Sequence, residues 1–195
     1  MTPAAHDLEL LRQLRAGTAS AFQALYQRHQ GPLFRFALLR SGSDDTAADI
    51  VQEVFMGLLT DSFKYDPLRG PLQNFLFGVA RRLLLRHEAP RLRHDSIDGG
   101  EEDEEDHESA DERCEPLARL LANEAAEQVR CALAQLPPHQ RDAVILYELH
   151  DLTYLEIADI CQVDIGTVRS RLSRGRGALA RRLAALRPQP QEATS

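Results

Sequence analysis

The chain has 195 residues, of which 43% are hydrophobic and 6% aromatic, and its formal net charge is −7. This length suits one medium domain or two small ones, and the apolar fraction is far above that of a disordered chain. No apolar run approaches the ~20 residues needed to cross a bilayer, and the N-terminus lacks the basic and apolar blocks of a signal peptide. We therefore expect a cytoplasmic protein with no membrane span.

The negative charge is concentrated in one segment. Asp98 and nine further acids between Glu101 and Glu112 contribute ten negative charges, with no Lys or Arg among them. Without these residues the formal charge changes from −7 to +3. Because the remainder is mildly basic, the overall acidity does not exclude a nucleic-acid partner.

Apolar residues recur at helical spacing along most of the chain, and no stretch alternates as a β-strand would. We predict an all-α protein in which Gly31-Pro32 kinks or interrupts the first long helical run and Pro90 ends the helix before it. The expected helical runs cover about 7–40 (with a break at Gly17), 44–60, 72–87, 115–134, 138–149, 154–160 and 165–186.

A segment without core-forming residues divides the helices into two groups. From about Ala89 to Cys114 the chain is charged, contains glycine and is almost free of apolar residues, so we expect a flexible acidic linker. The predicted organisation is two small helical domains, with boundaries at 1–88 for the first domain, 89–114 for the linker, 115–187 for the second domain and 188–195 for a tail.

The second domain contains a helix-turn-helix pattern. Thr153 and Glu156 have the spacing of a capping box, in which each side chain bonds the other residue's backbone N–H. Cys161-Gln162-Val163 forms the expected turn, and Asp164 is a good N-cap for the helix that follows.

The last helix is rich in arginine. Seven arginines and no acid occur between Ile165 and Arg187, and Ile165, Val168, Leu172, Gly175 and Leu179 follow a 3-4 spacing that predicts a buried face. A rigid helix with an apolar back and a Ser/Arg front fits the DNA major groove, because arginine supplies paired donors to guanine and phosphate. The alternative is an ordinary amphipathic helix whose basic face is only solvated.

Five segments form a recognisable pattern by their order and separation. They are Leu136–Arg141, Leu152–Ala158 and Gly166–Leu172 in the second domain, and Ala21–Tyr26 and Asp49–Phe55 in the first. Each motif alone is moderately specific, but together they resemble the extracytoplasmic-function (ECF) group of bacterial sigma factors in the sigma-70 family.

This resemblance implies a non-catalytic subunit that binds core RNA polymerase, at the β′ clamp helices and the β flap, and directs promoter-specific transcription initiation. Contacts to the −35 element would come from Arg169, Ser170, Arg171, Ser173, Arg174 and Arg176. Contacts to the −10 element would come from Phe63, Tyr65, Arg69, Asn74, Arg81, Arg82 and Arg86, and polymerase contacts from Asp49, Gln52 and Glu53. Phe75 and Phe77 are expected in the core.

The resemblance also implies an anti-sigma factor as a candidate partner. The acidic linker would thread through polymerase, either as a mimic of nucleic acid in a basic channel or as an extended solubilising spacer. The chain departs from the family at Gln162, where glycine is usual, so that modest strain or a different turn is expected. Near Asn74 and Phe75 relatives often have tryptophan, and Arg81-Arg82 stands where they often have asparagine after the arginine.

Two other classes of protein fit the sequence less well. A stand-alone helix-turn-helix regulator would need a sensor or dimerisation domain, whereas the first domain matches the polymerase-binding pattern. A hydrolase or metalloenzyme is not expected, because the sequence has no nucleophile elbow, phosphate loop or cluster of metal ligands. We accordingly expect no cofactor and no metal.

Overall fold

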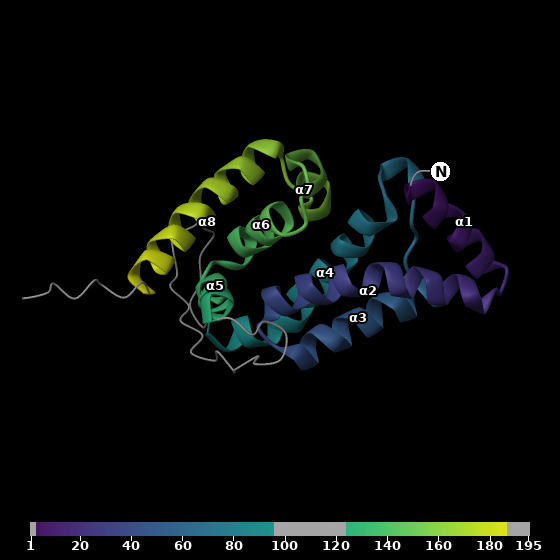
Figure 1. The fold of residues 1–195 in the computed structure, drawn as a ribbon, viewed down its shortest axis with the longest axis horizontal. Coiled ribbons are helices and arrows are strands. Elements are labelled where there is room, and N and C mark those ends of the chain that lie inside the picture. The colour runs from purple at the N-terminus through teal and green to yellow at the C-terminus, as the bar shows by residue number, and fades with distance from the viewer. Residues whose placement is uncertain (1–2, 96–123, 187–195) are drawn as a thin grey trace, which may run out of the picture.

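A computed structural model describes residues 3–95 and 124–186, and within these ranges every regular element is helical, as predicted (Figure 1). The elements are α1 (Pro3–Arg15), α2 (Ala19–Ser41), α3 (Asp44–Leu59), the 3-10 helix η1 (Pro67–Arg69), α4 (Leu72–Asp95), α5 (Glu124–Ala134), α6 (Pro138–Glu148), α7 (Tyr154–Cys161) and α8 (Ile165–Leu186). Most of the expected acidic linker and all of the expected tail lie outside the described residues.

The first domain is built around α2, which packs against α1, α3 and α4. Its apolar residues recur every three or four positions and therefore share the inner face of each helix. Leu25, Phe36, Val54 and Phe77 are fully buried at the centre of this core. The expected core position of Phe77 is confirmed.

A sharp turn joins α2 to α3. Gly42 has a φ of 73°, the left-handed conformation that ends a helix and that glycine adopts without steric cost. The next residue, Ser43, caps α3 by accepting a hydrogen bond from the N–H of Thr46 at 3.2 Å. The turn makes α3 fold back beside α2, which fixes the direction of the outer face of α3.

Two prolines lie inside helices. Pro32 is within α2, which runs without interruption from Ala19 to Ser41, and α4 continues past Pro90 to Asp95. The expected interruption at Gly31-Pro32 and the expected end of the helix near His87 are therefore wrong. Proline removes one backbone hydrogen bond of a helix, and packing of the flanking turns, such as the buried Leu33, compensates for that loss.

The second domain places α8 against α5, α6 and α7. Ile145, Leu146, Val168 and Leu172 are buried between α6 and α8. Figure 1 shows α8 along the outer edge of this domain, so none of the helices that the structure describes covers one of its long sides.

The two domains lie against each other, because α5 and α6 contact α2, and α7 contacts α4 (Figure 1). The residues between them, 96–123, are outside the described part of the chain. In the described ranges no helix is both long and apolar enough to cross a membrane.

Candidate nucleic-acid and polymerase interfaces

The helix-turn-helix has the local geometry that the sequence predicts. Thr153 Oγ1 accepts from the N–H of Glu156 at 3.3 Å, and Glu156 Oε2 accepts from the N–H of Thr153 at 2.9 Å, which completes the capping box. Gln162 ends α7 with φ 57° and ψ 49°, and its N–H donates to the carbonyls of Ala158 and Asp159. The turn therefore uses the left-handed conformation, in which a residue other than glycine is strained.

The buried face of α8 crosses α6 closely. Val168 and Leu172 are each 1% exposed, as predicted. A Cβ atom added to Gly175 would lie 2.8 Å from Val144 Cγ2, so only glycine allows this approach. Ile165, also expected on this face, is instead 36% exposed, because it is the first residue of α8 and precedes the crossing.

Four side chains predicted to contact the −35 element lie together on the uncovered side of α8. Arg169, Ser173 and Arg174 are exposed and Ser170 is half-buried. Ser170 Oγ donates to the carbonyl of Thr167 at 3.0 Å and accepts from Arg174 Nη2 at 3.3 Å, which orients both side chains along the helix. This arrangement presents hydrogen-bond donors on a helix slim enough for the major groove.

The other two side chains predicted to contact the −35 element have different surroundings. Arg171 is half-buried, and its Nη1 is buried without a hydrogen-bond partner in the part of the chain that the structure describes. Arg176 is exposed, but its Nε donates to Glu148 Oε1 at 2.5 Å, and its guanidinium lies 4.6 Å above the Tyr147 ring. The hydrogen bond from Arg176 to Glu148 raises the pKa of the guanidinium. The structure thus groups four of the six predicted side chains, and Arg171 and Arg176 do not belong to that group.

The aromatic side chains predicted to contact the −10 element are held in the loop before α4. Phe63 is half-buried over Gly57 of α3, where a Cβ atom would overlap its ring. Tyr65 is also half-buried, with its hydroxyl donating to the carbonyl of Gly70 at 2.8 Å and its ring 5.3 Å from that of Phe75. Both rings are thus partly packed on protein, which restricts their orientations before any base stacks on them.

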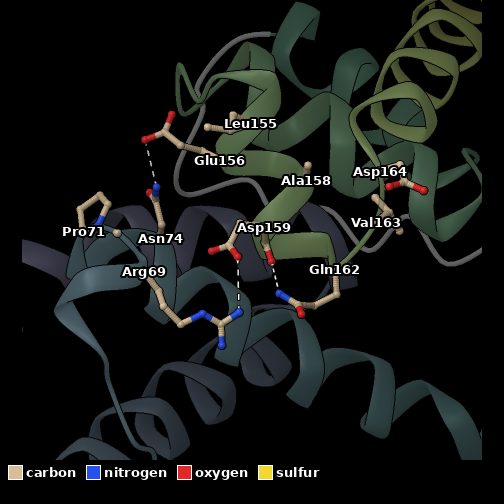
Figure 2. Close-up of a pocket in the computed structure, with 11 residues that line it drawn as sticks. Arg69, Pro71, Asn74, Leu155, Glu156, Ala158, Asp159, Gln162, Val163 and Asp164 are labelled. Atoms are coloured by element: carbon tan, nitrogen blue, oxygen red, sulfur yellow. Dashed lines mark hydrogen bonds and ion pairs between the residues drawn. The ribbon is translucent and has the colours of Figure 1, made fainter.

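Two polar side chains predicted to contact the −10 element meet acids of the other domain. Arg69 Nη2 lies 3.6 Å from Asp159 Oδ1, and Asn74 Nδ2 donates to Glu156 Oε1 at 3.0 Å, as Figure 2 shows. Burial alone would raise the pKa of Glu156, but hydrogen bonds from Thr153 and Asn74 outweigh it and lower that pKa. The carboxylate therefore stays charged beside Asn74, which is 7% exposed.

These contacts line a groove between the domains. Its volume is about 720 Å³, and its walls are the segment from Arg69 to Asn74 on one side and α7 with the following turn on the other (Figure 2). An adjoining hollow of about 540 Å³ includes Phe63, Tyr65 and Arg82 together with Asp159. Six of the seven side chains predicted for the −10 element, all except Arg86, line these two hollows, and α7 contributes to the walls of both.

Arg81, also predicted for the −10 element, takes part in a buried ionic cluster that the sequence does not predict. Asp142 of α6 is fully buried and accepts from Arg81 Nε at 2.8 Å and from Arg40 Nε at 2.5 Å. The guanidinium of Arg40 also binds both carboxylate oxygens of Glu88. Burial disfavours charge on Arg40, but Asp142 and Glu88 outweigh it and raise its pKa.

The last two side chains predicted for the −10 element lie further along α4 and are exposed. Arg82 Nε is 3.4 Å from the carbonyl of Gly78 one turn earlier, and Arg86 Nη2 donates to Glu53 Oε1 on α3 at 2.6 Å. Both side chains are accessible to a phosphate, although Arg86 already forms an ion pair with Glu53, a predicted polymerase contact.

The predicted polymerase contacts share the outer face of α3. Asp49, Gln52 and Glu53 are exposed, and Met56 on the same face is 51% exposed. Single exposed apolar side chains are common on protein surfaces, so Met56 adds apolar area to this acidic face without by itself marking an interface. Spacing alone could have indicated Met56, since it follows Gln52 and Glu53 by four and three residues.

An uncharged histidine fills part of the contact between the domains. His150 packs against Phe36 and Phe77 of the first domain, with ring-centroid distances of 6.3 and 4.7 Å. Burial, followed by the charge of Arg35, lowers the pKa of His150 to about 4, and Asp151 offsets only part of this effect. Its Nε2 is buried without a hydrogen-bond partner among the described residues.

Two regions of the chain match known families. Residues 25–91 match the family described as Sigma-70 region 2, and residues 126–179 match the family described as Sigma-70, region 4. These ranges fall within the two domains, which are accordingly named region 2 and region 4, and region 4 contains the helix-turn-helix.

Curated relatives are similar over most of the chain. The ECF RNA polymerase sigma factor SigM of Mycobacterium tuberculosis is 32% identical over 181 residues, covering 91% of this chain and 84% of that protein. EcfG of Rhodopseudomonas palustris is 31% identical, with coverages of 74% and 75%. SigE of Mycolicibacterium smegmatis is 30% identical, and the match spans 80% of this chain but 59% of that relative.

Solved structures have the same arrangement of helices. The sigma factor RpoE in complex with the anti-sigma factor NepR, from Bartonella quintana, has a TM-score of 0.63 at 28% identity, covering 85% of this chain and 98% of that chain. CnrH in complex with the cytosolic domain of CnrY has a TM-score of 0.65 at 20% identity, covering 93% and 99%, which supports the fold alone. Both regions match sigma-70 families, and SigM of Mycobacterium tuberculosis is 32% identical over most of its length. The chain therefore belongs to the ECF RNA polymerase sigma factors of the sigma-70 family.

Proposed function

We propose that this ECF sigma factor binds core RNA polymerase through α3, reads the −35 element through α8 and holds the −10 element on the surface formed by residues 63–86. The observation that carries the proposal is a group of side chains on the side of α8 that no other described helix covers, with Arg169, Ser173 and Arg174 exposed and Ser170 half-buried. The family supplies the reaction, promoter-specific initiation, and the exposed positions of these side chains support the roles proposed for them.

Reading of the −35 element rests on the front of α8. Arginine can donate two hydrogen bonds to a guanine edge, and serine adapts to any base. The capping box and the turn at Gln162 fix the start of α8 relative to α7, so the donors are held at a defined angle to the groove. Arg176, bound to Glu148, lies further along the helix and is better placed to approach a phosphate than a base.

Holding of the −10 element rests on aromatic and basic residues around one hollow. Phe63 and Tyr65 offer ring edges and faces for unstacked bases, and Arg69 and Arg82 offer positive charge for the backbone. Arg86 lies outside the hollow, further along α4, where it is exposed. Melted DNA needs both kinds of contact, because stacking holds the bases while salt-sensitive contacts hold the phosphates. Asn74 supplies the amide for a base edge.

Docking on polymerase rests on α3. Asp49, Gln52 and Glu53 would bind the β′ clamp helices, with Met56 as an apolar anchor at the centre of the same face. Region 4 would contact the β flap. In this proposal the chain contributes no catalytic group of its own and acts inside the cell as a specificity subunit.

An anti-sigma factor is a further proposed partner. RpoE, similar to this chain over 85% of its length, was solved with the anti-sigma factor NepR. We propose that a partner of this class controls when the present sigma factor reaches polymerase.

Run-off transcription with purified core polymerase and genomic fragments tests the proposed function. We expect discrete transcripts only when the chain is added, and their loss with Glu53→Lys, which places a positive charge on the α3 face. Asp44→Asn, at the exposed start of the same helix, is the matched control and should leave transcription intact. Absence of both core binding and promoter-dependent transcripts would contradict the proposal.

A further inference from the structure

The first helix, α1, precedes the range that matches Sigma-70 region 2, which begins at residue 25. It packs on α2 and also contacts α4, and its residues Leu10 and Leu11 are buried in the core of the first domain. Figure 1 shows α1 beside the segment of residues 60–71, which joins α3 to α4. We call this segment the 60–71 loop. It carries Phe63 and Tyr65, so α1 lies next to the aromatic side chains proposed to bind the −10 element.

The buried face of α1 also carries a carboxylate. Asp7 is 5% exposed, and both of its oxygens are bound by α2. Oδ1 accepts from Arg28 Nη1 at 2.5 Å, and Oδ2 lies 3.1 Å from His29 Nε2. Because a carboxylate only accepts, the histidine ring donates here through Nε2. A buried carboxylate without partners would be costly, so these two contacts fix where α1 sits on α2.

The charge of Asp7 acts on the 60–71 loop. Burial raises the pKa of the Tyr65 hydroxyl, and the negative charges of Asp7 and then Asp66 raise it further. The effect of one charge on another falls with distance and is screened by salt, so the Asp7 carboxylate lies near the Tyr65 side chain. The N-terminal half of α1 therefore adjoins the middle of the loop.

Tyr65 determines the shape of the loop beyond this point. Its hydroxyl donates to the carbonyl of Gly70 at 2.8 Å, which joins the two sides of η1. Gly70 has a φ of 135°, a conformation that favours glycine. Asp66 caps η1 by accepting from the N–H of Leu68 at 3.0 Å. Any shift of Tyr65 would thus move Arg69, which lies inside this closed turn.

The last turn of α1 contacts the start of the same loop. Arg15 Nη2 donates to Asp61 Oδ1 at 3.1 Å, between two exposed side chains. Asp61 has a φ of 50°, a left-handed conformation that a residue with a Cβ atom adopts at some cost. An exposed ion pair contributes little stability by itself, but this one restricts the direction in which the loop leaves α3. α1 therefore meets the loop at two points, one at each end of the helix.

We propose that α1 positions the 60–71 loop for the −10 element, and that Asp7 is the positioning residue, because it fixes α1 on α2 while α1 contacts the loop. This inference rests on the function proposed above for Phe63, Tyr65 and Arg69. Asp7 is buried and acts through the loop rather than by contact with DNA. Ordering a loop during binding costs free energy, so a loop held in place beforehand binds the melted strand more tightly.

Asp7→Asn removes the buried charge and keeps the shape of the side chain. Glu9→Gln is the matched control, because it makes the same chemical change on the exposed side of α1. Circular dichroism verifies that both variants keep their helix content.

Arg15→Glu tests the second contact at an exposed position, where the fold tolerates the change even if Asp7→Asn proves unstable. It sets two negative charges against each other at Asp61. Arg12→Glu, also exposed on α1, makes the same change in net charge away from the loop and is its matched control. Adding Asp61→Asn to Arg15→Glu removes the repulsion, and asparagine tolerates the left-handed conformation, so this double variant should regain function.

The measurement is the affinity of full-length holoenzyme for two fragments of a promoter found by run-off transcription. One is a single-stranded oligonucleotide with the non-template −10 sequence, and the other is a duplex with the −35 element alone. If the loop without its support is correctly placed about a tenth of the time, the apparent affinity for the −10 strand falls about tenfold. We expect this loss for Asp7→Asn and Arg15→Glu, with the −35 affinity changed less than about twofold, and neither loss for the two controls.

A spectroscopic measurement reports on the loop without DNA. In nuclear magnetic resonance of the chain with carbon-13-labelled tyrosine, Tyr65→Phe identifies the Tyr65 signal. Asp7→Asn should lower the pKa of Tyr65, because it removes a negative charge that raises it, and Glu9→Gln should not. An unchanged titration of Tyr65 in Asp7→Asn would show that α1 does not act on the loop.

A loss of −10 affinity that Glu9→Gln or Arg12→Glu matches overturns the proposal. An equal loss of −35 affinity does so too, because α1 would then support the whole fold, and so does a failure of Asp61→Asn to rescue Arg15→Glu. Tyr65→Ala separates this failure from that of the proposed function. If Tyr65→Ala weakens binding of the −10 strand and the α1 variants do not, only the positioning by α1 is wrong. If Tyr65→Ala has no effect either, the proposed role of this surface is wrong as well.

Discussion

Gln162 shows how one residue sets the angle of the helix proposed to read the −35 element. Its φ of 57° lies in the left-handed region, which costs a residue with a Cβ atom about 1–2 kcal/mol relative to glycine. The side-chain amide returns part of this cost by bonding the carbonyl of Asp159. The residue thus keeps the turn that glycine gives other members of the family, with some strain stored in it.

Gln162→Gly should increase the free energy of unfolding by about 1 kcal/mol, because it removes the left-handed strain. Urea titration followed by circular dichroism measures this change. Gln162→Ala is the matched control, since it keeps the strain and loses the bond to Asp159, and it should destabilise the protein. A lower midpoint for Gln162→Gly would show that the turn is not strained.

Arg174→Ala should weaken binding to the preferred −35 sequence by about 1–3 kcal/mol and reduce the preference over other bases at one position. Competition binding of holoenzyme to promoter variants measures both effects. Arg181→Ala, two turns further along α8 and also exposed, serves as the control and should keep the base preference. Equal losses across all sequences, with a smaller dependence on salt, would identify Arg174 as a phosphate contact instead.

Part of the site could be predicted residue by residue. Helical periodicity correctly placed Arg169 and Arg174 on the exposed side of α8, because that side is determined by the helix itself. It could not predict that Arg171 is half-buried or that Arg81 meets Asp142, because those contacts depend on how helices and domains pack. Asp142 and Arg40 give no signal of their own, since charged residues at such positions are usually solvated.

At the scale of elements, periodic apolar residues predicted the bounds of α3, α6, α7 and α8 to within one residue. Proline was the main source of error, because Pro32 and Pro90 lie inside helices that continue past them. Local sequence rules report the cost of a proline but not the tertiary contacts that outweigh it. The helix-turn-helix was predictable because its capping box and turn are themselves local.

The crossing of α8 over α6 depends on Gly175. Gly175→Ala brings a methyl group to 2.8 Å from Val144 Cγ2, so the two helices must separate and the free energy of unfolding should fall by about 1–3 kcal/mol. Gly166→Ala, on the same helix with nothing within 4 Å, is the control and should be neutral or stabilising by up to about 1 kcal/mol. Thermal unfolding of both variants measures the difference, and equal effects would contradict the close crossing.

For the whole molecule, the contact between the domains should depend on pH through His150. The pKa of His150 is about 4 when the two domains are in contact and 6.5 for an unperturbed histidine. Between these pH values the chain with separated domains therefore binds more protons than the chain with the domains in contact. The contact between the domains therefore keeps its full stability above pH 6.5, and His150 weakens it as the pH falls towards 4.

Small-angle scattering at pH 7.5 and 5, at about constant ionic strength, should show expansion at the lower pH. His150→Leu removes the titrating group while filling the space against Phe36 and Phe77, and it should remain compact at both values. His29, whose pKa burial also lowers despite Asp7, is retained in this control. The same expansion in His150→Leu would assign the pH dependence to a group other than His150.

The central claim is that one chain uses two separate surfaces on one promoter and does so together with polymerase. Permanganate and nuclease footprinting of a promoter found by run-off transcription tests it most directly. With core polymerase present, we expect protection of the −35 element that Arg174→Ala weakens, and unpaired, reactive thymines at the −10 element. Protection by the chain alone with no dependence on polymerase, or no strand opening in its presence, would contradict the account.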